Sequence, residues 1–334
     1  MDTKPTQPHK LHQMKPLASL SLDLDNEWSY LKTRGDATWE AMPSYLDCVV
    51  PRVLEILARR QLKITFFIVG QDAALEKNRS ALRQLSAAGH EIGNHSHRHE
   101  PWLHLYSEDE LEVELANAEM HIEAATGVRP DVFRGPGFSL SETTLRVLRR
   151  RGYRYDASTF PTFLGPLARA YYFMAARLSP EERAKRSKLF GSLRDGLRPL
   201  KPYRWQLEDG SLLEIPVSTM PIFRVPIHLS YVIYLHALAP WLARAYCGFA
   251  LRLCRISGVE PSILLHPLDF LGAEDVPSLS FFPGMGLSAA SKLGCAEHYL
   301  ERLQDLFDVR SLGDHAGLIE RRTSLPLVTA AFQP

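Results

Sequence analysis

The feature that most constrains the fold of this chain is an alternation between short apolar runs and longer segments with helical spacing. The run Leu17–Leu24 predicts a buried strand, and the run 62–69, which Gly70 closes, predicts a second one. Between and after them, residues 45–60 and 107–126 carry apolar side chains at helical spacing. Strands that alternate with helices of about 10–18 residues indicate an α/β fold with a parallel sheet, either open or closed into a barrel.

The alternation continues along the chain and is interrupted twice. Further strands are predicted near 91–92, 131–133, 153–155, 211–216, 261–265 and 309, and further helices over 79–88, 141–151 and 288–305. The interruptions, at about 160–205 and 220–258, are too long for ordinary connections and predict largely helical insertions that cap the site. We expect a flexible arm over 1–15, a single domain over 16–320 and a tail over 321–334.

The charges are unevenly distributed, although 39 Lys and Arg against 38 Asp and Glu leave a formal net charge of +1. Residues 165–259 carry fourteen basic and six acidic side chains, so this window has eight excess positive charges and the remainder seven excess negative charges. Apolar and aromatic side chains accompany the basic ones in both insertions, which fits elements lying on an anionic membrane surface. The alternative is amphipathic helices packed over the domain with their arginines in solvent. The near-neutral total argues against a nucleic-acid partner.

The cysteines and the N-terminal residues bear on the cellular compartment. The four cysteines are scattered without a Cys-x-x-Cys pair, which fits a reducing compartment. Residues 1–15 are polar and lack the apolar segment of a signal peptide. The charge-free stretch 225–243 contains two prolines and two histidines, which argues against a membrane-spanning helix. We therefore expect a cytoplasmic protein, peripheral on the inner face of the cytoplasmic membrane.

Five clusters of polar residues directly follow the apolar runs, where catalytic groups collect in parallel barrels. They are 21–27 with Asp23 and Asp25, 94–99 with His95 and His99, 133–138 with Arg134 and Gly137, 155–158 with Asp156, and 263–267 with His266.

The first two clusters carry the pattern of a metal site. Asp23 and Asp25 share a face of a regular strand, where two close carboxylates repel each other unless a cation shares the site. His95 and His99 fall on one side if their segment is helical, which suits two imidazole ligands of one ion, whereas His97 would point elsewhere. Each cluster alone also has a purely structural interpretation, such as a solvated strand end, an ordinary turn or a buried core histidine.

Taken together and in this order, the five clusters resemble the five motifs of the polysaccharide deacetylase family, carbohydrate esterase family 4. The run Ile64–Gly70 also looks like the second strand of that family. The resemblance implies a distorted (β/α) barrel and a metal-dependent hydrolase that removes N-acetyl groups from amino sugars. The sequence departs from the family pattern in the residue between Asp23 and Asp25 and in the segment 26–30 after them, which stands in place of a glycine. It also departs in the glycine at position 137, where many relatives carry an aromatic residue.

By position, the resemblance implies that Asp25, His95 and His99 hold one divalent metal ion. Zinc is the expected ion, and cobalt, nickel or iron would also suit this ligand set. Asp23 looks like the general base that takes a proton from water, and Arg134 would orient it.

The remaining motifs supply the other half of the reaction. His266 looks like the general acid that protonates the departing amine, and Asp156 would orient it. The backbone N–H of Gly137 is the candidate donor to the oxyanion.

The insertions suggest where the substrate lies. A deacetylase on the cytoplasmic membrane face would meet a lipid-linked amino sugar or a glycolipid precursor. The alternatives are a soluble oligo- or polysaccharide, a formyl or other amide substrate, and a membrane-associated binding protein without catalysis. The last of these requires a lost ligand or base, and the sequence retains all of them.

Overall fold

The structure, a computed structural model, describes residues 15–165, 195–322, 324–330 and 332. The predicted arm, apart from Lys15, and most of the first predicted insertion lie outside the described residues. In chain order, the first half contains β1 (Leu17–Leu24), α1 (Glu27–Arg34), α2 (Leu46–Arg59), β2 (Thr65–Ile68), α3 (Gly70–Ala74), α4 (Glu76–Ala87), β3 (Glu91–Asn94), α5 (Glu108–Thr126), β4 (Val132–Phe133), α6 (Glu142–Arg150) and β5 (Tyr155–Asp156). The second half contains β6 (Tyr203–Leu207), β7 (Gly210–Glu214), α9 (Leu229–Leu238), α10 (Pro240–Ile256), β8 (Ser262–Leu265), α11 (Ala289–Leu306), β9 (Asp308–Arg310), α12 (Leu312–Arg322) and β10 (Leu327–Thr329).

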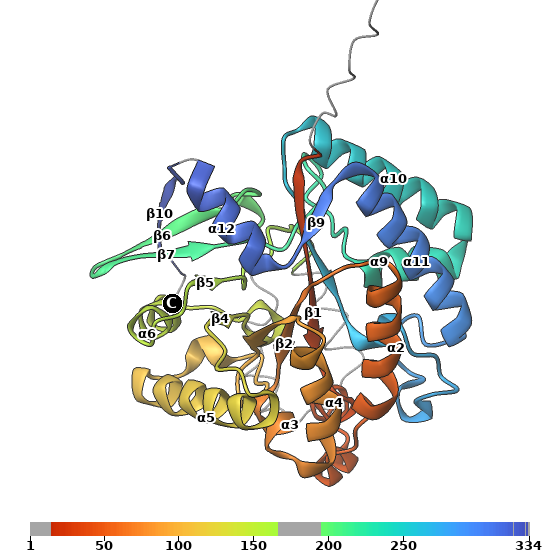
Figure 1. Cartoon of the computed structure of the whole chain (residues 1–334), viewed down its shortest axis with the longest axis horizontal. Coiled ribbons are helices and arrows are strands. Elements are labelled where there is room, and N and C mark those ends of the chain that lie inside the picture. The colour runs from red at the N-terminus through yellow and green to blue at the C-terminus, as the bar shows by residue number, and fades with distance from the viewer. Residues whose placement is uncertain (1–14, 166–194, 323, 331, 333–334) are drawn as a thin grey trace, which may run out of the picture.

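The predicted parallel strands form one sheet in the order β7-β5-β4-β3-β2-β1-β8. Beyond β7, the backbone N–H of Val217 donates to the Thr159 carbonyl, and that of Ser218 donates to the Ser262 carbonyl of β8, both at 2.9 Å. The segment after β7 therefore joins the two ends of the parallel run. Together with the helices around the strands, this confirms the predicted distorted (β/α) barrel (Figure 1).

Two strands extend the sheet beyond the prediction. β6 pairs antiparallel with β7 through a turn at Glu208 and Asp209, and β10 pairs parallel with β6. The end of the first predicted insertion is thus a strand, and the predicted tail 321–334 contributes an edge strand. The second predicted insertion, 220–258, is helical as expected and consists mainly of α9 and α10.

The helices surround the strands, with α2, α10 and α11 on one side and α5 and α6 on another (Figure 1). The largest apolar cluster lies between β1, β2 and β8 and the helices α2, α4, α9, α10 and α11. All eight residues of β1 are buried. A strand buried on both faces carries polar side chains only where they have partners. We therefore expect the acids near its end to have charged or hydrogen-bonding partners.

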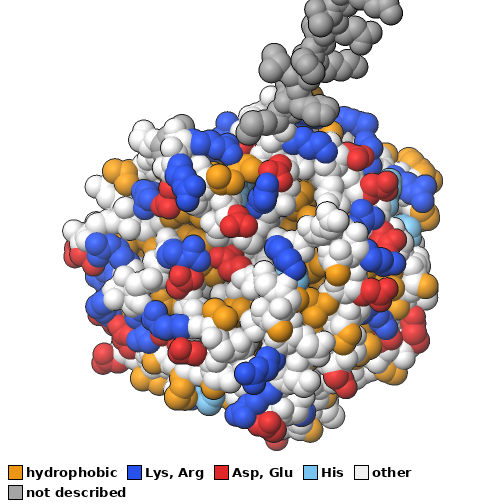
Figure 2. All heavy atoms as spheres, in the orientation of Figure 1, with side chains coloured by type: hydrophobic (Ala, Val, Ile, Leu, Met, Phe, Trp, Pro, Cys, Tyr) orange, Lys and Arg blue, Asp and Glu red, His pale blue; other side chains and the backbone are white. Residues whose placement is uncertain are grey.

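Charged side chains of both signs are interspersed over the face seen in Figure 2. Ion pairs account for part of this mixing, for example those of Arg150 with Glu108 and Glu112, which link α6 to α5. Among the described helices, none combines the length and apolar character needed to cross a membrane.

Candidate metal and acid–base site

β1 carries the first two acids to one edge of the sheet. Asp23 is the last but one residue of β1 and pairs in register with Phe67 of β2, while Asp25 directly follows the strand. On the other side of β1, Leu22 pairs with Leu265 of β8, so His266 reaches the same edge as Asp23. The parallel register therefore brings residues that are more than two hundred positions apart in the sequence to one site, as the strand-end prediction required.

His95 and His99 converge as predicted, but the helical spacing proposed for them is wrong. The segment after β3 is a loop in which Ser96 and His99 have left-handed backbone conformations, with φ of 62° and 54°. Asn94 and Ser96 stabilise this turn, because the Asn94 side chain accepts from the Ser96 N–H at 2.8 Å and the Ser96 hydroxyl from the His99 N–H at 3.1 Å. As predicted, His97 points elsewhere and stacks on His121.

The three predicted metal ligands meet at one point. Asp25, His95 and His99 offer ligand atoms within 4.8 Å of one another, the one such group in the described part of the chain. Asp25 Oδ1 lies 2.9 Å from His99 Nε2 and 3.3 Å from His95 Nε2. A carboxylate with two imidazoles is a ligand set that Zn²⁺ and related ions use.

The hydrogen bond behind His95 indicates that a cation fits this site. His95 Nδ1 lies 2.7 Å from the Arg134 carbonyl oxygen, which can only accept, so Nδ1 carries the proton. In the neutral ring, Nε2 is then a bare lone pair directed at a carboxylate oxygen. Two electron-rich atoms this close need a positive charge, either a ring proton or a metal ion. A carbonyl behind a ligating histidine is also the usual support of such a ligand.

The electrostatics of the site point the same way. Burial alone raises the pKa of Asp25, but the charges and hydrogen bonds of His99 and His95 hold it well below its usual value. Burial lowers the pKa of His95, yet the carboxylates of Asp23 and Asp25 raise it above its usual value. Both pKa shifts indicate that the protein stabilises positive charge between the carboxylates of Asp23 and Asp25.

Asp23 is fixed by Arg134, as predicted. Arg134 is fully buried, and its Nη1 donates to Asp23 Oδ1 at 2.7 Å and to Ser21 Oγ at 2.8 Å. Its Nε donates to the Ala157 carbonyl at 2.9 Å, and the guanidinium lies over the Phe67 ring. A buried carboxylate with a charge-assisted hydrogen bond keeps its orientation. We call Asp23, Asp25, His95, His99 and Arg134 the metal side of the site.

His266 lies across the site in a different setting. Its Nδ1 is 3.1 Å from the Ser230 hydroxyl of α9, and its backbone N–H donates to Asp269 Oδ2 at 2.9 Å. Lys292 of α11 supports the same loop, because its ammonium group donates to the carbonyls of Leu268 and Leu271. We call His266, Ser230, Asp269 and Lys292 the acid side.

The carboxylate beside His266 is Asp269, where the sequence analysis expected Asp156. Within the described residues, the Asp156 side chain accepts from the Ser158 hydroxyl at 2.6 Å and shares a hydrogen bond with buried Glu214. Burial and the neighbouring Asp156 raise the pKa of Glu214 well above its usual value. A hydrogen bond between two carboxyl groups also requires a proton on one of them. The contacts of Asp156 are therefore with Ser158 and Glu214, and its role in orienting His266 stays a prediction.

Gly137 occupies a turn that follows β4. It has φ of 57° and is exposed, and Phe138, in the next position, stacks on Phe160 with ring centroids 4.6 Å apart. An aromatic residue thus stands one position after Gly137. The oxyanion role of the Gly137 N–H remains a prediction.

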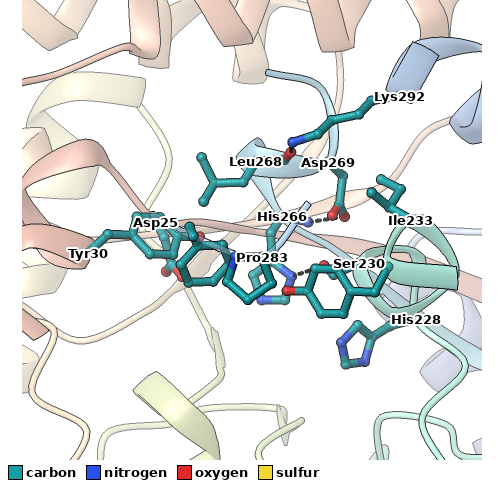
Figure 3. Close-up of a pocket in the computed structure, with 12 residues that line it drawn as sticks. Asp25, Tyr30, His228, Ser230, Ile233, His266, Leu268, Asp269, Pro283 and Lys292 are labelled. Atoms are coloured by element: carbon teal, nitrogen blue, oxygen red, sulfur yellow. Dashed lines mark hydrogen bonds between the residues drawn. The ribbon is translucent and has the colours of Figure 1, made fainter. Parts of the chain in front are cut away.

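One pocket joins the two sides of the site (Figure 3). Asp25 and His266 both line it, and the aromatic rings of Tyr30, Tyr234 and Phe282 form part of its wall. The ring of Phe282 contacts that of Tyr30 edge-on, with centroids 5.2 Å apart. A pocket with aromatic walls and a few directed polar groups suits a small polar ring that has apolar faces.

Sequence reasoning missed three residues around His266 and the hydrogen-bonded group at the start of α1. Ser230, Asp269 and Lys292 follow no motif, and the last two are recognised only by their burial against His266 and its loop.

The departure after Asp25 also has a structural explanation. Asn26 caps α1, and its side chain and the Trp28 indole both donate to buried Asp72, at 2.6 and 2.9 Å. An Asn before a Glu-containing segment that ends at Gly35 was a readable helix signal.

Comparisons with known proteins bear on the predicted family resemblance. Residues 36–155 match the sequence model of the family described as polysaccharide deacetylase, which confirms the predicted resemblance. The matched range contains His95, His99 and Arg134, whereas Asp23, Asp25 and His266 lie outside it and join the site through the fold. The chain is 31% identical over 96 residues to a peptidoglycan-N-acetylglucosamine deacetylase of Bacillus cereus. It is 30% identical over 111 residues to a peptidoglycan-N-acetylmuramic acid deacetylase of Bacillus subtilis.

These sequence matches cover 29% and 33% of this chain, and only 34% and 41% of the two relatives. The match to a solved structure is longer. A structure described as a putative polysaccharide deacetylase from Mycobacterium smegmatis aligns over 100% of this chain and 99% of its own, with a TM-score of 0.59 and 19% identity. This similarity extends the family fold to the parts of the chain outside residues 36–155.

Proposed function

We propose that this protein is a metal-dependent N-deacetylase of an amino sugar. The observation that carries the proposal is the convergence of Asp25, His95 and His99 beside the Asp23–Arg134 pair, with His266 facing the same pocket. A divalent cation held by these three ligands would polarise the amide carbonyl and acidify a water molecule. The names of the relatives, which describe deacetylases of peptidoglycan, support the same reaction.

The residues of the chain divide the proton transfers between the two sides. Asp23, held by Arg134, accepts a proton from the attacking water, and His266 delivers a proton to the departing amine. Because these residues approach from neighbouring strands, β1 and β8, the amide lies between them. The N–H of Gly137 is the proposed backbone donor to the oxyanion.

We propose a lipid-linked amino sugar or glycolipid precursor as the substrate, at the inner face of the cytoplasmic membrane. α9 and α10 support this choice. α9 lines the pocket with Ser230, Ile233 and Tyr234, and ends at Leu238, which is 78% exposed. The neighbouring surface carries further exposed apolar side chains on α10 and in the loop before α9: Ile222, Phe223, Trp241, Phe249 and Ile256.

The exposed face of α10 has the composition of a membrane-surface helix. Trp241, Phe249 and Ile256 lie on one face at helical spacing, and Arg244, Arg252 and Arg255 are also exposed there. No acidic residue occurs between Ile215 and Val259. Exposed apolar side chains with arginines favour contact with an anionic bilayer, and the cytoplasmic leaflet has a negative surface potential.

A second candidate substrate is peptidoglycan or a soluble fragment of it. The printed names of the two Bacillus relatives favour it. The acetyl group and the metal are common to both candidates, so the same assay distinguishes them. The metal-loaded protein is incubated with an N-acetylated polyprenyl-phosphate sugar, a peptidoglycan oligomer and a formylated analogue, and released acetate or formate is measured by mass spectrometry.

We expect acetate from the lipid-linked sugar, and no release after the metal is removed with a chelator. Release restored by added Zn²⁺ or Co²⁺ would establish the metal requirement. Acetate from the oligomer alone would overturn the lipid-linked substrate but keep the reaction. No release from any amide in the presence of metal would overturn the proposed reaction itself.

The membrane surface has its own test. The double variant Trp241→Ala/Phe249→Ala should reduce co-flotation with vesicles containing anionic lipid by about tenfold, because two apolar side chains that would insert into the bilayer are lost. The matched control is Val113→Ala/Met120→Ala on α5, whose side chains are similarly exposed at 60% and 54%. Wild-type protein that stays in the soluble fraction at low salt would contradict the proposal.

A further inference from the structure

We infer that the hydroxyl of Ser230, which the second insertion supplies, positions His266 by linking its imidazole to the carboxylate of Asp269. The inference deepens the proposed function, since it rests on His266 as the proton donor to the departing amine. It assigns to α9 a part in the reaction in addition to lining the pocket.

The contacts of Ser230 carry the inference. Its hydroxyl lies 3.1 Å from His266 Nδ1 (Figure 3). The same hydroxyl is close enough to the Asp269 side chain to lower the pKa of that carboxyl through a hydrogen bond. Ser230 is 7% exposed and Asp269 is 2% exposed, so water does not readily replace either contact. A buried hydroxyl between an imidazole and a carboxylate holds both in fixed orientations.

Proton accounting gives the direction of the two hydrogen bonds. The hydroxyl has one proton, and an ionised carboxylate can only accept, so Ser230 donates to Asp269. Ser230 then accepts from the imidazole, which places a proton on His266 Nδ1. The other ring nitrogen, Nε2, is therefore the one free to exchange a proton with substrate in the pocket.

Asp269 also holds the backbone of the same residue, because its Oδ2 accepts from the His266 N–H at 2.9 Å. One carboxylate thus fixes the main chain directly and the side chain through Ser230. The other titratable groups around His266 are His228 of α9, whose pKa is held well below its usual value by burial, His266 and Arg134, and Lys292 of α11. Asp25 and Tyr30 face it from the opposite wall of the pocket.

The test compares Ser230→Ala with Ser230→Thr, which keeps a hydroxyl. The matched control is Ser257→Ala, an exposed serine at the end of α10 in the same insertion. Histidine-selective ¹⁵N NMR of the metal-loaded protein should show His266 protonated at Nδ1 in the wild type. In Ser230→Ala this preference should be lost, while Ser230→Thr and Ser257→Ala should retain it.

The kinetic readout is the pH profile of acetate release. In Ser230→Ala, kcat should fall roughly 10- to 100-fold, less than the full contribution of a general acid, and KM should change little. The alkaline limb of the profile should move to lower pH, since the link from the cationic imidazole to the Asp269 carboxylate is broken. Ser230→Thr should restore both kcat and the limb to near wild-type values.

An unchanged His266 tautomer in Ser230→Ala would overturn the inference, as would an unchanged pH profile. A loss of activity that Ser230→Thr does not restore would also overturn it, because it would indicate a packing role. The NMR measurement needs no turnover, so the inference can succeed or fail even if the wild-type protein releases no acetate.

Discussion

The metal side and the acid side face one pocket but are built in different ways. The residues of the metal side lie at or just after the ends of β1, β3 and β4, and strand register fixes their positions. The acid side combines the end of β8 with side chains from α9 and α11, which pack over the barrel. The difference indicates that the barrel strands and the loops that follow them position the candidate metal ligands, whereas the setting of His266 depends on the second insertion.

The largest expected effect comes from removing a metal ligand. His99→Ala should abolish metal binding and deacetylation together, since His99 supplies one of three ligand atoms. The loss of affinity should exceed the roughly 10- to 100-fold that removal of a supporting partner costs. Metal content after gel filtration and acetate release are the measurements, and circular dichroism checks the fold. A variant with full metal content and activity would contradict the assigned metal side.

Asp23→Asn should separate the two functions of the metal side. The amide oxygen of Asn can still accept from Arg134, so the buried guanidinium keeps a partner and the metal should remain bound. Turnover should fall about 10²- to 10⁴-fold, because the group can no longer take up a proton. Loss of the metal in this variant would mean that Asp23 is a ligand and would blur the distinction between base and ligands.

Lys292→Met should disturb the acid side alone. The variant leaves the Leu268 and Leu271 carbonyls without their donor, so we expect a loss of about 1–3 kcal/mol in the free energy of unfolding. The metal content should not change, whereas kcat should fall severalfold as the loop that carries His266 loosens. Equal effects on metal affinity and kcat would contradict the separation of the two sides.

The wild type and Lys292→Met should also differ in how their free energy of unfolding depends on pH. Burial lowers the pKa of Lys292 from 10.5 to about 8. Between these values the unfolded chain binds more protons than the folded one, so this contribution to stability increases as the pH rises. The wild type should therefore gain up to about 2 kcal/mol over Lys292→Met between about pH 7.5 and about pH 10, measured by denaturant unfolding. A constant difference would show that Lys292 titrates normally.

The contrast between the sides also explains what could be predicted from the sequence. Leu17–Leu24 was predicted with its correct bounds, because a run that alternates leucine with small residues and ends in acids has few other interpretations. His95 and His99 were correctly paired but for a wrong reason. Their spacing suits a helix, whereas the structure uses two left-handed residues stabilised by local side-chain hydrogen bonds, for which propensity gives no signal.

The acid side was less predictable, because its contacts are tertiary. Nothing local distinguishes Ser230 from the other serines, and its partners His266 and Asp269 lie more than thirty residues away. Asp156 was assigned to His266 through the family resemblance alone. Glu214 hydrogen-bonds it, and that carboxyl pair forms only when β5 and β7 align.

The barrel closes unevenly, and this has a consequence for how it moves. β1 pairs along four residues with each of β2 and β8, whereas the joint between the segment after β7 and β8 depends on Ser218. Its N–H donates to the Ser262 carbonyl and its hydroxyl accepts from the Ser262 N–H. Local opening requires less free energy where fewer contacts break, so the barrel should open more readily at this contact than on either side of β1. Ser218 leads along the chain to α9, and Ser262 lies on β8, which ends just before His266. Opening between Ser218 and Ser262 would therefore move the acid side away from the metal side and let a bulky substrate enter between them.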